Sequence, residues 1–398
     1  MQINLVFMFF KEKPSPQLRV SVIVPVKNEA ETISICLDAL RVQKSGDQLL
    51  LSPHLYEVLL LANNCDDDTY RIILEYKEKF PEFNLQVEEL FLNEEIAYIG
   101  TARRFLMDAA YNRFLFLGKM DGIISSTDGD SCVDELWIWQ IMQEMAKGCD
   151  VVGGLILTEI EECAAKKYHL LDLRYQNLIA KREDMVDPQP HNPWPSHFQC
   201  FGANFSITCK MYAQAGRLPE VSCLEDVAFY KILEMHDAKI RKSPYVKVLT
   251  STRKNGRVEK GLSQQLAYFE EIGCQKEDLK VECAQAIISR LKIKKSLREL
   301  WKHFHSNRHT QDPQFVAKPL NEVQIMYWLS KYETFGAVWE EAQEYLNEIE
   351  WFNQWELVDI NIAIHDLESA EGMISRKLKM EEVIDKRLDA CGTTSASI

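Results

Sequence analysis

The sequence predicts an α/β fold, in which a mostly parallel sheet is flanked by helices and followed by a helical C-terminal region. Residues 18–25 and 58–62 are runs rich in Val, Ile and Leu, the pattern of strands buried on both faces of a parallel sheet. Each run is followed by polar residues and then by apolar residues at helical spacing. From Leu262 onward helical periodicity dominates and no buried-strand pattern recurs. This alternation of strands and helices indicates a Rossmann-like sheet.

The first strand is expected to end at Pro25, because proline cannot donate to a sheet ladder. The helix after it presents Ile33, Leu37 and Leu40 on one face. We expect the other strands at residues 58–62, 84–91, 149–159, 201–207 and 240–250, with one more that leads into Asp128. We expect the other helices at residues 70–79, 99–112, 163–184 and 211–215, and from about residues 134 and 224 onward. Residues 114–120 are interpreted as an insertion before the strand that carries Asp128.

Length and composition limit the classes of function. The chain has 398 residues, which suggests about two domains, and its net charge is -14. An acidic surface argues against nucleic acid or anionic lipid as a partner. The 11 cysteines form no Cys-x-x-Cys pair, which fits reduced thiols in a cytoplasmic protein. No apolar run reaches the roughly 18 residues of a membrane span.

We divide the chain into an N-terminal arm at residues 1–17, an α/β domain at 18–262, a helical domain at 263–390 and a disordered tail at 391–398. The apolar residues 5–10 of the arm have no basic residue before them, so an extra strand or a packing arm is favoured over a signal peptide. The helical domain packs through its tryptophans, and whether it also mediates homo-oligomer formation or shapes a binding site stays open.

Polar residues follow several predicted strands at the edge where ligands bind in open α/β sheets. Asn28 and Glu29 follow the first strand, and residues 63–69 form an Asn- and Asp-rich turn after the second. Asp128-Gly129-Asp130 follows a third. Two carboxylates one residue apart can hold a divalent cation or a ribose hydroxyl, and Mg²⁺ prefers carboxylates together with substrate phosphates. Each motif alone is also compatible with an ordinary surface turn.

The order of these motifs is more specific than any one of them. The Pro-x-x-Asn-Glu turn is followed by the Asn/Asp turn, by Gly-x-Ala-Arg at residues 100–103, by Asp-x-Asp, by Gly-Ala-Asn at 202–204 and by Glu-Asp at 225–226. Over residues 18–262 this series resembles the family 2 glycosyltransferases, which have a GT-A fold. The resemblance implies an enzyme that transfers a sugar from a nucleotide-diphosphate sugar, of UDP or GDP type, to a hydroxyl acceptor.

The resemblance also implies a role for individual residues. The donor nucleotide would be bound by Val24, Pro25, Asn28, Glu29, Asn63, Asp67, Arg103, Asp128 and Gly129. Asp130, with Asp128, would hold Mg²⁺ or Mn²⁺, and Arg253 and Arg257 would help hold the diphosphate. Gly202, Ala203 and Asn204 would lie near the donor sugar and the acceptor. Asp226 would be the catalytic base, with Glu225 binding acceptor hydroxyls beside it.

The expected reaction is a metal-dependent, inverting, hexosyltransferase-like glycosyl transfer with Asp226 as the base. A dinucleotide-dependent oxidoreductase is disfavoured because the turn after the first strand lacks Gly-x-Gly-x-x-Gly. A sugar-phosphate nucleotidyltransferase is disfavoured because that turn is not a Gly-rich, Arg-containing loop. A noncatalytic nucleotide-sugar-binding protein with a degenerate site remains the alternative.

Overall fold

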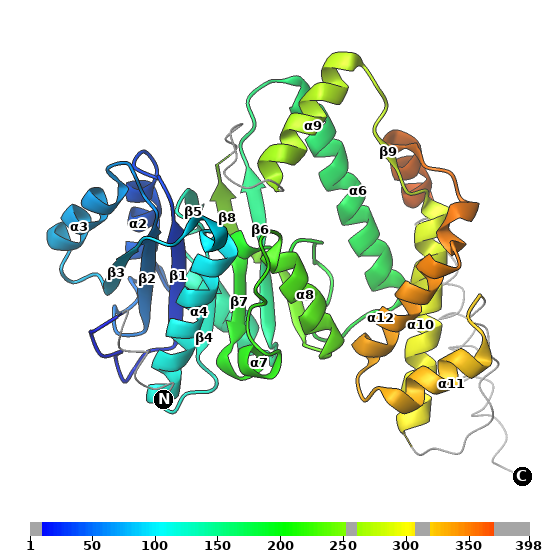
Figure 1. Ribbon diagram of the computed structural model, residues 1–398, viewed down its shortest axis with the longest axis horizontal. Helices are drawn as coiled ribbons and strands as arrows, with labels where there is room; N and C mark the ends of the chain where they lie inside the picture. Colours follow the sequence, from blue (N-terminus) through cyan, green and yellow to red (C-terminus); the bar gives the residue numbers. More distant parts are fainter. Residues whose placement is uncertain (1–9, 252–260, 307–318, 370–398) are drawn as a thin grey trace, which may run out of the picture.

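A computed structural model describes residues 10–251, 261–306 and 319–369 (Figure 1). Most of the predicted arm, the predicted tail at 391–398, and both Arg253 and Arg257 lie outside the described residues. The part that carries the large sheet lies at one end of the molecule, and the helices of the C-terminal region lie at the other (Figure 1).

An eight-stranded sheet has the strand order β3-β2-β1-β4-β7-β6-β8-β5. Strands β3, β2, β1 and β4 are mutually parallel, as are β6 and β8, while β7 and β5 run antiparallel to their neighbours. The predicted α/β fold with a mostly parallel sheet is therefore confirmed. The strands are β1 (Val20–Val26), β2 (Tyr56–Asn63), β3 (Leu85–Leu90), β4 (Ile123–Ser126), β5 (Ser131–Val133), β6 (Val151–Thr158), β7 (Phe205–Thr208) and β8 (Ile240–Thr250).

Helices cover both faces of this sheet. The helices of this part are α2 (Ile33–Arg41), α3 (Thr69–Lys79), α4 (Ile99–Phe116), α5 (Trp137–Met145), α6 (Ala164–Val186), α7 (Cys209–Gln214) and α8 (Glu225–Met235), with the 3-10 helices η1 (Glu94–Ile96) and η2 (Gly202–Asn204). One hydrophobic core joins α2, α3 and α5 to one face, and another joins α4, α7 and α8 to the other. Both cores are needed because successive residues of a strand point to opposite faces.

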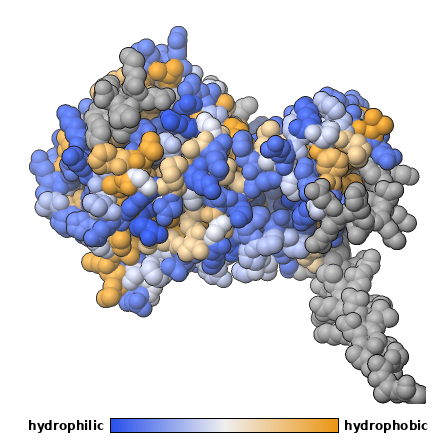
Figure 2. All heavy atoms as spheres, turned by 90° about the horizontal axis from the view of Figure 1, so that it is seen from below, coloured by the Kyte–Doolittle hydropathy of each residue, from blue (hydrophilic) through white to orange (hydrophobic). Residues whose placement is uncertain are grey.

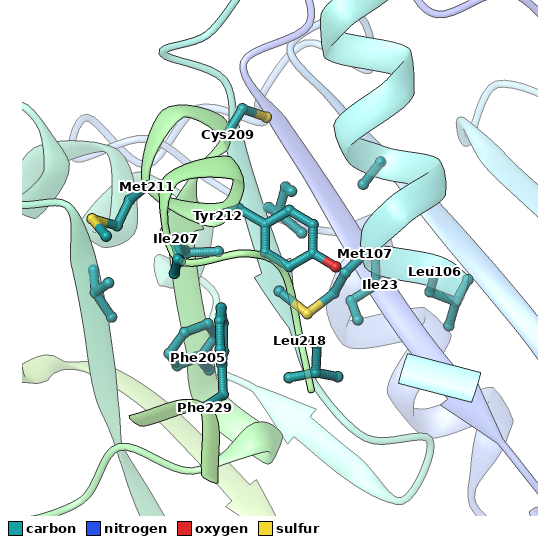
Figure 3. Close-up of a cluster of buried hydrophobic side chains, with 14 of the residues drawn as sticks. Ile23, Leu106, Met107, Phe205, Ile207, Cys209, Met211, Tyr212, Leu218 and Phe229 are labelled. Atoms are coloured by element: carbon teal, nitrogen blue, oxygen red, sulfur yellow. The ribbon is translucent and has the colours of Figure 1, made fainter. Parts of the chain in front are cut away.

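The core under α4 and α8 shows this alternation. Ile23 of β1 points into it, whereas its neighbours Val22 and Val24 belong to the core on the opposite face. Figure 3 shows the Tyr212 ring at the centre of the first core, near Met107 of α4 and Ile23. The Tyr212 hydroxyl is satisfied because it donates to Asp108 Oδ1 (2.8 Å). Strands buried on both faces explain why the apolar runs in the sequence are nearly continuous.

Some local expectations differ from the structure. Residues 114–120 are not an insertion, because α4 continues to Phe116, and the Phe114 ring packs against Gly122 just before β4. The strand expected at residues 201–207 begins only at Phe205, because residues 202–204 form η2. Strand β5 was not expected, since three residues are too short to show a period.

The C-terminal region is helical, as predicted. Its elements are α9 (Leu262–Gln275), α10 (Ala284–His305), α11 (Glu322–Lys331) and α12 (Phe335–Glu348), with η3 (Trp351–Gln354) and a two-stranded pair of β9 (Lys280–Val281) and β10 (Val358–Asp359). Helix α6, which precedes Leu262, shares a hydrophobic core with α9 and α10. The division of the chain at residue 262 stays a prediction.

Helix α12 is joined to the end of α8. The Asp237 carboxylate accepts from the backbone N–H groups of Phe335 (2.7 Å) and Gly336 (2.8 Å), so it caps α12. Thr334 Oγ1 donates to Met235 O (2.7 Å). A Cβ at Gly336 would lie 1.7 Å from Glu234 O, so only glycine fits this close approach. The C-terminal region therefore holds the end of α8 directly.

The face seen in Figure 2 is mainly hydrophilic, with apolar residues gathered in separate patches. No helix in the described part of the chain is long and apolar enough to cross a bilayer.

A buried ion pair is expected to carry much of the stability of the sheet. Arg113 of α4 donates to Glu57 of β2 at 2.5 Å, with both side chains almost fully buried. Arg113→Met is expected to destabilise the protein by about 3–5 kcal/mol, because it leaves a buried carboxylate without its cation. Chemical denaturation followed by circular dichroism measures this loss.

The matched control for this test is Arg71→Met. Arg71 pairs with Asp68 and Glu75 on the surface, so its loss should leave the denaturation midpoint almost unchanged. An equal loss in both variants would contradict the importance of the buried pair.

Candidate active site

The predicted site residues meet at one edge of the sheet. The register of the parallel strands places Val26 opposite Ala62 and Ile23 opposite Ser126. The carboxyl ends of β1, β2 and β4 are therefore neighbours. The edge also receives η2, because β7 runs antiparallel to β4 and starts opposite its last residue.

The turns after β1 and β2 are tied together by hydrogen bonds. Asn28 adopts a left-handed conformation with φ 54°, which asparagine tolerates better than most residues. Its Oδ1 accepts from Asp66 N (2.9 Å), and its Nδ2 donates to the Asp66 carboxylate. Asp67 Oδ2 accepts from Ala30 N (3.2 Å). Asn28 and Asp67 thus hold the floor of the edge in place.

Two polar atoms at this edge are buried without a hydrogen-bond partner among the described residues. They are Asn63 Oδ1, at the end of β2, and Thr127 Oγ1, directly after β4. Buried polar atoms are nearly always paired in native proteins, so an orphaned pair at a ligand-binding edge indicates that a bound group satisfies them. Thr127 was not among the predicted site residues, although it lies next to Asp128.

Arg103 of α4 is the centre of a buried network. Its guanidinium donates to Glu225 Oε1 (3.0 Å), to Asp128 Oδ1 (3.0 Å) and to Gly202 O (2.9 Å), and also to Ser126. The Arg103 side chain is 6% exposed and that of Glu225 is 5% exposed. One side chain therefore connects three segments that lie far apart in the sequence.

The electrostatics of this network follow from its geometry. Burial by itself would lower the pKa of Arg103, but the carboxylates of Asp128, Glu225 and Asp226 raise it above its usual value. The guanidinium is therefore permanently charged. It neutralises part of the negative charge that Asp128, Glu225 and Asp226 place around it.

Gly202 allows this network to form. A Cβ at Gly202 would lie 2.7 Å from Arg103 Cζ, so any side chain would displace the guanidinium. The backbone N–H of Gly202 donates to Asp226 Oδ2 (2.8 Å). The η2 turn is thus held on one side by Arg103 and on the other by Asp226.

Glu225 and Asp226 begin α8 but face different surroundings. The Glu225 side chain points inward to Arg103, whereas Asp226 is partly exposed at the mouth of the edge. The structure therefore places Asp226 where an acceptor can reach it. It places Glu225 behind Asp226, in the network, rather than open to acceptor hydroxyls.

Asn204 lies in the protein interior. Its Oδ1 accepts from Trp137 Nε1 (2.9 Å), and its Nδ2 donates to Leu155 O and Val246 O (both 3.1 Å). A Cβ at Gly154 would lie 2.2 Å from Asn204 Nδ2, so the backbone of β6 approaches closely. The Asn204 side chain joins β6, β8 and α5, while Ala203 beside it is partly exposed.

The Asp128-Gly129-Asp130 turn is clamped between β4 and β5. A Cβ at Gly129 would lie 3.0 Å from Val26 Cγ2, which packs the turn tightly against β1. Strand β5 follows at once and pairs with the end of β8. Within the described residues, no group of three His, Cys, Asp or Glu side chains is arranged to hold a metal ion. A cation here would need ligands from a bound molecule or water.

The proline-rich loop before η2 is anchored to β8. Arg241 donates to Pro193 O (2.6 Å) and Pro195 O (2.9 Å). His197, at the end of this loop, is buried, and burial lowers its pKa to about 4. The loop is thus packed against the sheet, and His197 is neutral at physiological pH.

Asn204→Asp is expected to destabilise the fold by about 3 kcal/mol, because it removes two donors and buries a carboxylate. Thermal and chemical denaturation measure this loss. Asn93→Asp is the matched control, since Asn93 is exposed and makes no capping hydrogen bond. A loss of ligand binding at an unchanged denaturation midpoint would instead assign Asn204 to the binding surface.

Comparison with known proteins agrees with this site. Residues 21–207 match the family described as Glycosyl transferase family 2. This segment contains Asn28, Asn63, Arg103 and the Asp128 turn. No curated protein matches the chain.

Three solved structures of low similarity share parts of the architecture. S. aureus TarS 1-349 in complex with UDP-GlcNAc is 15% identical over 72% of each chain, with a TM-score of 0.43. The mannosyltransferase PcManGT from Pyrobaculum calidifontis in complex with GDP-Man and Mn2+ is 15% identical over 87% of this chain and 82% of its own, with a TM-score of 0.38. GalNAc-T7 with UDP, GalNAc and Mn2+ is 12% identical over 83% of this chain and 58% of its own, with a TM-score of 0.44. Similarity at this level does not transfer a substrate or a metal to this chain.

The family match covers the part of the chain that builds β1 to β4, α4 and the turn to β7. Through residues 21–207 the chain belongs to glycosyl transferase family 2, the family that its ordered motifs resemble.

Proposed function

We propose that the protein transfers a sugar from a nucleotide-diphosphate sugar to an acceptor hydroxyl, with inversion at the anomeric carbon. The observation that carries this proposal is the buried Arg103 network, which holds Asp128 and the start of α8 at one edge of the sheet. It puts a carboxylate turn suited to a diphosphate beside Asp226, a carboxylate suited to deprotonate a hydroxyl.

The nucleotide of the donor is proposed to bind over the ends of β1 and β2. Asn63 Oδ1 is a buried acceptor without a partner among the described residues, and it suits a base N–H group. Pro25, Asn28 and Glu29 form the adjacent turn, and Asp67 supports it. Thr127 Oγ1 offers a second such buried atom, close to where a ribose bound by Asp128 would lie.

The diphosphate is proposed to lie at Asp128, Gly129 and Asp130. Because Arg103 takes one oxygen of Asp128, the turn fits a cation held mainly by Asp130, the diphosphate and water. Mg²⁺ or Mn²⁺ bound there would neutralise the charge that develops on the departing nucleoside diphosphate. Arg253 and Arg257, which lie outside the described residues, remain proposed diphosphate contacts.

Asp226 is the proposed base. Its Oδ2 already accepts from Gly202 N, which fixes the carboxylate beside η2, and the side chain is partly exposed. A carboxylate held in this way can take the proton of a hydroxyl that attacks the anomeric carbon from the face opposite the diphosphate. Glu225 is proposed to position Arg103, while Gly202 and Ala203 line the sugar side.

A noncatalytic nucleotide-sugar-binding protein is the alternative to a transferase. It would retain donor binding at the edge of the sheet but show no turnover. The described cysteines are all free, which supports our placement of the activity in the reducing cytoplasm.

The donor site is tested by thermal unfolding with UDP, GDP and dTDP, each with and without Mn²⁺. One nucleotide is expected to stabilise the protein by about 2.7 kcal/mol at 100 times its dissociation constant, with most of the effect dependent on Mn²⁺. Asp130→Ala should remove the metal-dependent part, whereas Asp47→Ala, at an exposed carboxylate in the loop after α2, should not. If no nucleotide stabilises the protein, the proposed function is wrong.

The base is tested by Asp226→Asn. Transfer is expected to fall by about 10²–10⁴-fold, because the amide cannot accept a proton, while nucleotide affinity stays within about twofold. Glu234→Gln, at the exposed far end of the same helix, is the control and should keep full activity. Full transfer by Asp226→Asn would exclude this residue as the base.

A further inference from the structure

Large apolar side chains are exposed on the segments that surround Asp226. Tyr98 precedes α4, Phe201 precedes η2, and Val221, Leu224 and Val227 flank or follow the start of α8. Each is between 37% and 45% exposed. We call these five residues the apolar rim.

Contacts between the backbone segments show that the rim is continuous with the site. A Cβ at Gly100 would lie 3.1 Å from Glu225 Cβ and 3.2 Å from Val221 O, so the start of α4 lies against the segment that leads into α8. The hydrogen bond from Gly202 N to Asp226 brings Phe201 to the other side of the same carboxylate. The rim therefore borders the proposed base from three segments of the chain.

Leu224 shows that the exposure is built into the backbone. It has φ 55° and ψ 39°, a left-handed conformation that is a genuine outlier for a bulky residue. The chain keeps this conformation directly before Glu225 and leaves the Leu224 side chain in solvent. Strained residues persist where the surrounding structure requires them, and they cluster at ligand sites.

The charges around the rim indicate a neutral ligand. Arg103 is paired with Asp128 and Glu225, and Arg104 donates to Leu218 O (2.9 Å) and pairs with Glu220 (3.2 Å). These two arginines of α4 are thus committed to other partners. An anionic acceptor would meet the carboxylate of Asp226 with no compensating cation from them.

We propose that the apolar rim binds a hydrocarbon group carried by a neutral acceptor, next to the hydroxyl that receives the sugar. This inference rests on the proposed function and names the chemical class of its acceptor. Aliphatic side chains outnumber aromatic ones in the rim, which suits an alkyl chain better than the face of a second sugar. The acceptor is accordingly an uncharged alkyl-bearing alcohol or glycoside rather than a purely polar glycan.

The proposal is tested with hexyl β-D-glucoside and methyl β-D-glucoside, which share the same hydroxyls and differ only in alkyl length. Isothermal titration in the presence of the nucleotide identified above measures both dissociation constants. Hexyl glucoside is expected to bind at least about tenfold more tightly, because each buried methylene adds to binding. Hexyl phosphate, the anionic probe, is expected to bind at least about tenfold more weakly than hexyl glucoside.

Two rim variants locate the effect. Leu224→Asn removes the apolar side chain but places a residue that tolerates the left-handed conformation, so the fold is kept. Val227→Thr keeps the side-chain shape. Both should reduce the preference for hexyl over methyl glucoside by about fivefold or more. Val323→Thr, at an exposed valine of α11 that is 82% exposed, is the matched control and should leave the preference unchanged.

The outcomes separate this inference from the proposed function. Equal affinity for the two glucosides, no saturable binding of either, or an equal loss in Val323→Thr would overturn the apolar rim as an acceptor site while nucleotide binding persists. Tighter binding of hexyl phosphate would overturn the neutral acceptor. Absence of nucleotide binding would instead remove the proposed function itself.

Discussion

The buried guanidinium of Arg103 is the interaction on which the site depends. A charge this far from water is tolerated only with carboxylates and acceptors around it, and Asp128, Glu225 and Gly202 supply them. These partners come from the end of β4, from α8 and from η2. The requirement to satisfy one arginine therefore fixes where the carboxylate turn, the proposed base and the sugar-side turn lie relative to one another.

Helix α8 connects this site to the rest of the molecule. Its first turn carries Glu225 and Asp226, and its last residues bind α12 through Thr334 and the Asp237 cap. The close approach at Gly336 leaves little room for α8 to slide along α12. The C-terminal region thus contributes to placing the proposed base, although it lies far from the base in the sequence.

Much of the α/β fold and the members of the site were predictable because they depend on local pattern. Apolar runs with β-branched residues identified β1 and β2, and polar turns after them identified Asn28, Asn63 and Asp128, since parallel strands end at one edge. The inward direction of Glu225 and the interior place of Asn204 were not predictable, because each depends on partners more than 40 residues away. Strand β5 was too short to show a period.

The sequence by itself determined the order of the strands and helices along the chain, the polar edge of the sheet and membership of a glycosyltransferase family. These follow from periodicity and motif order, which are properties of neighbouring residues. Only the tertiary structure decided that Arg103 links Asp128 to Glu225, that Asp226 alone of the acidic pair is open to an acceptor, and that apolar side chains border it. Those facts depend on burial and on contacts between distant segments, and neither is written in local sequence.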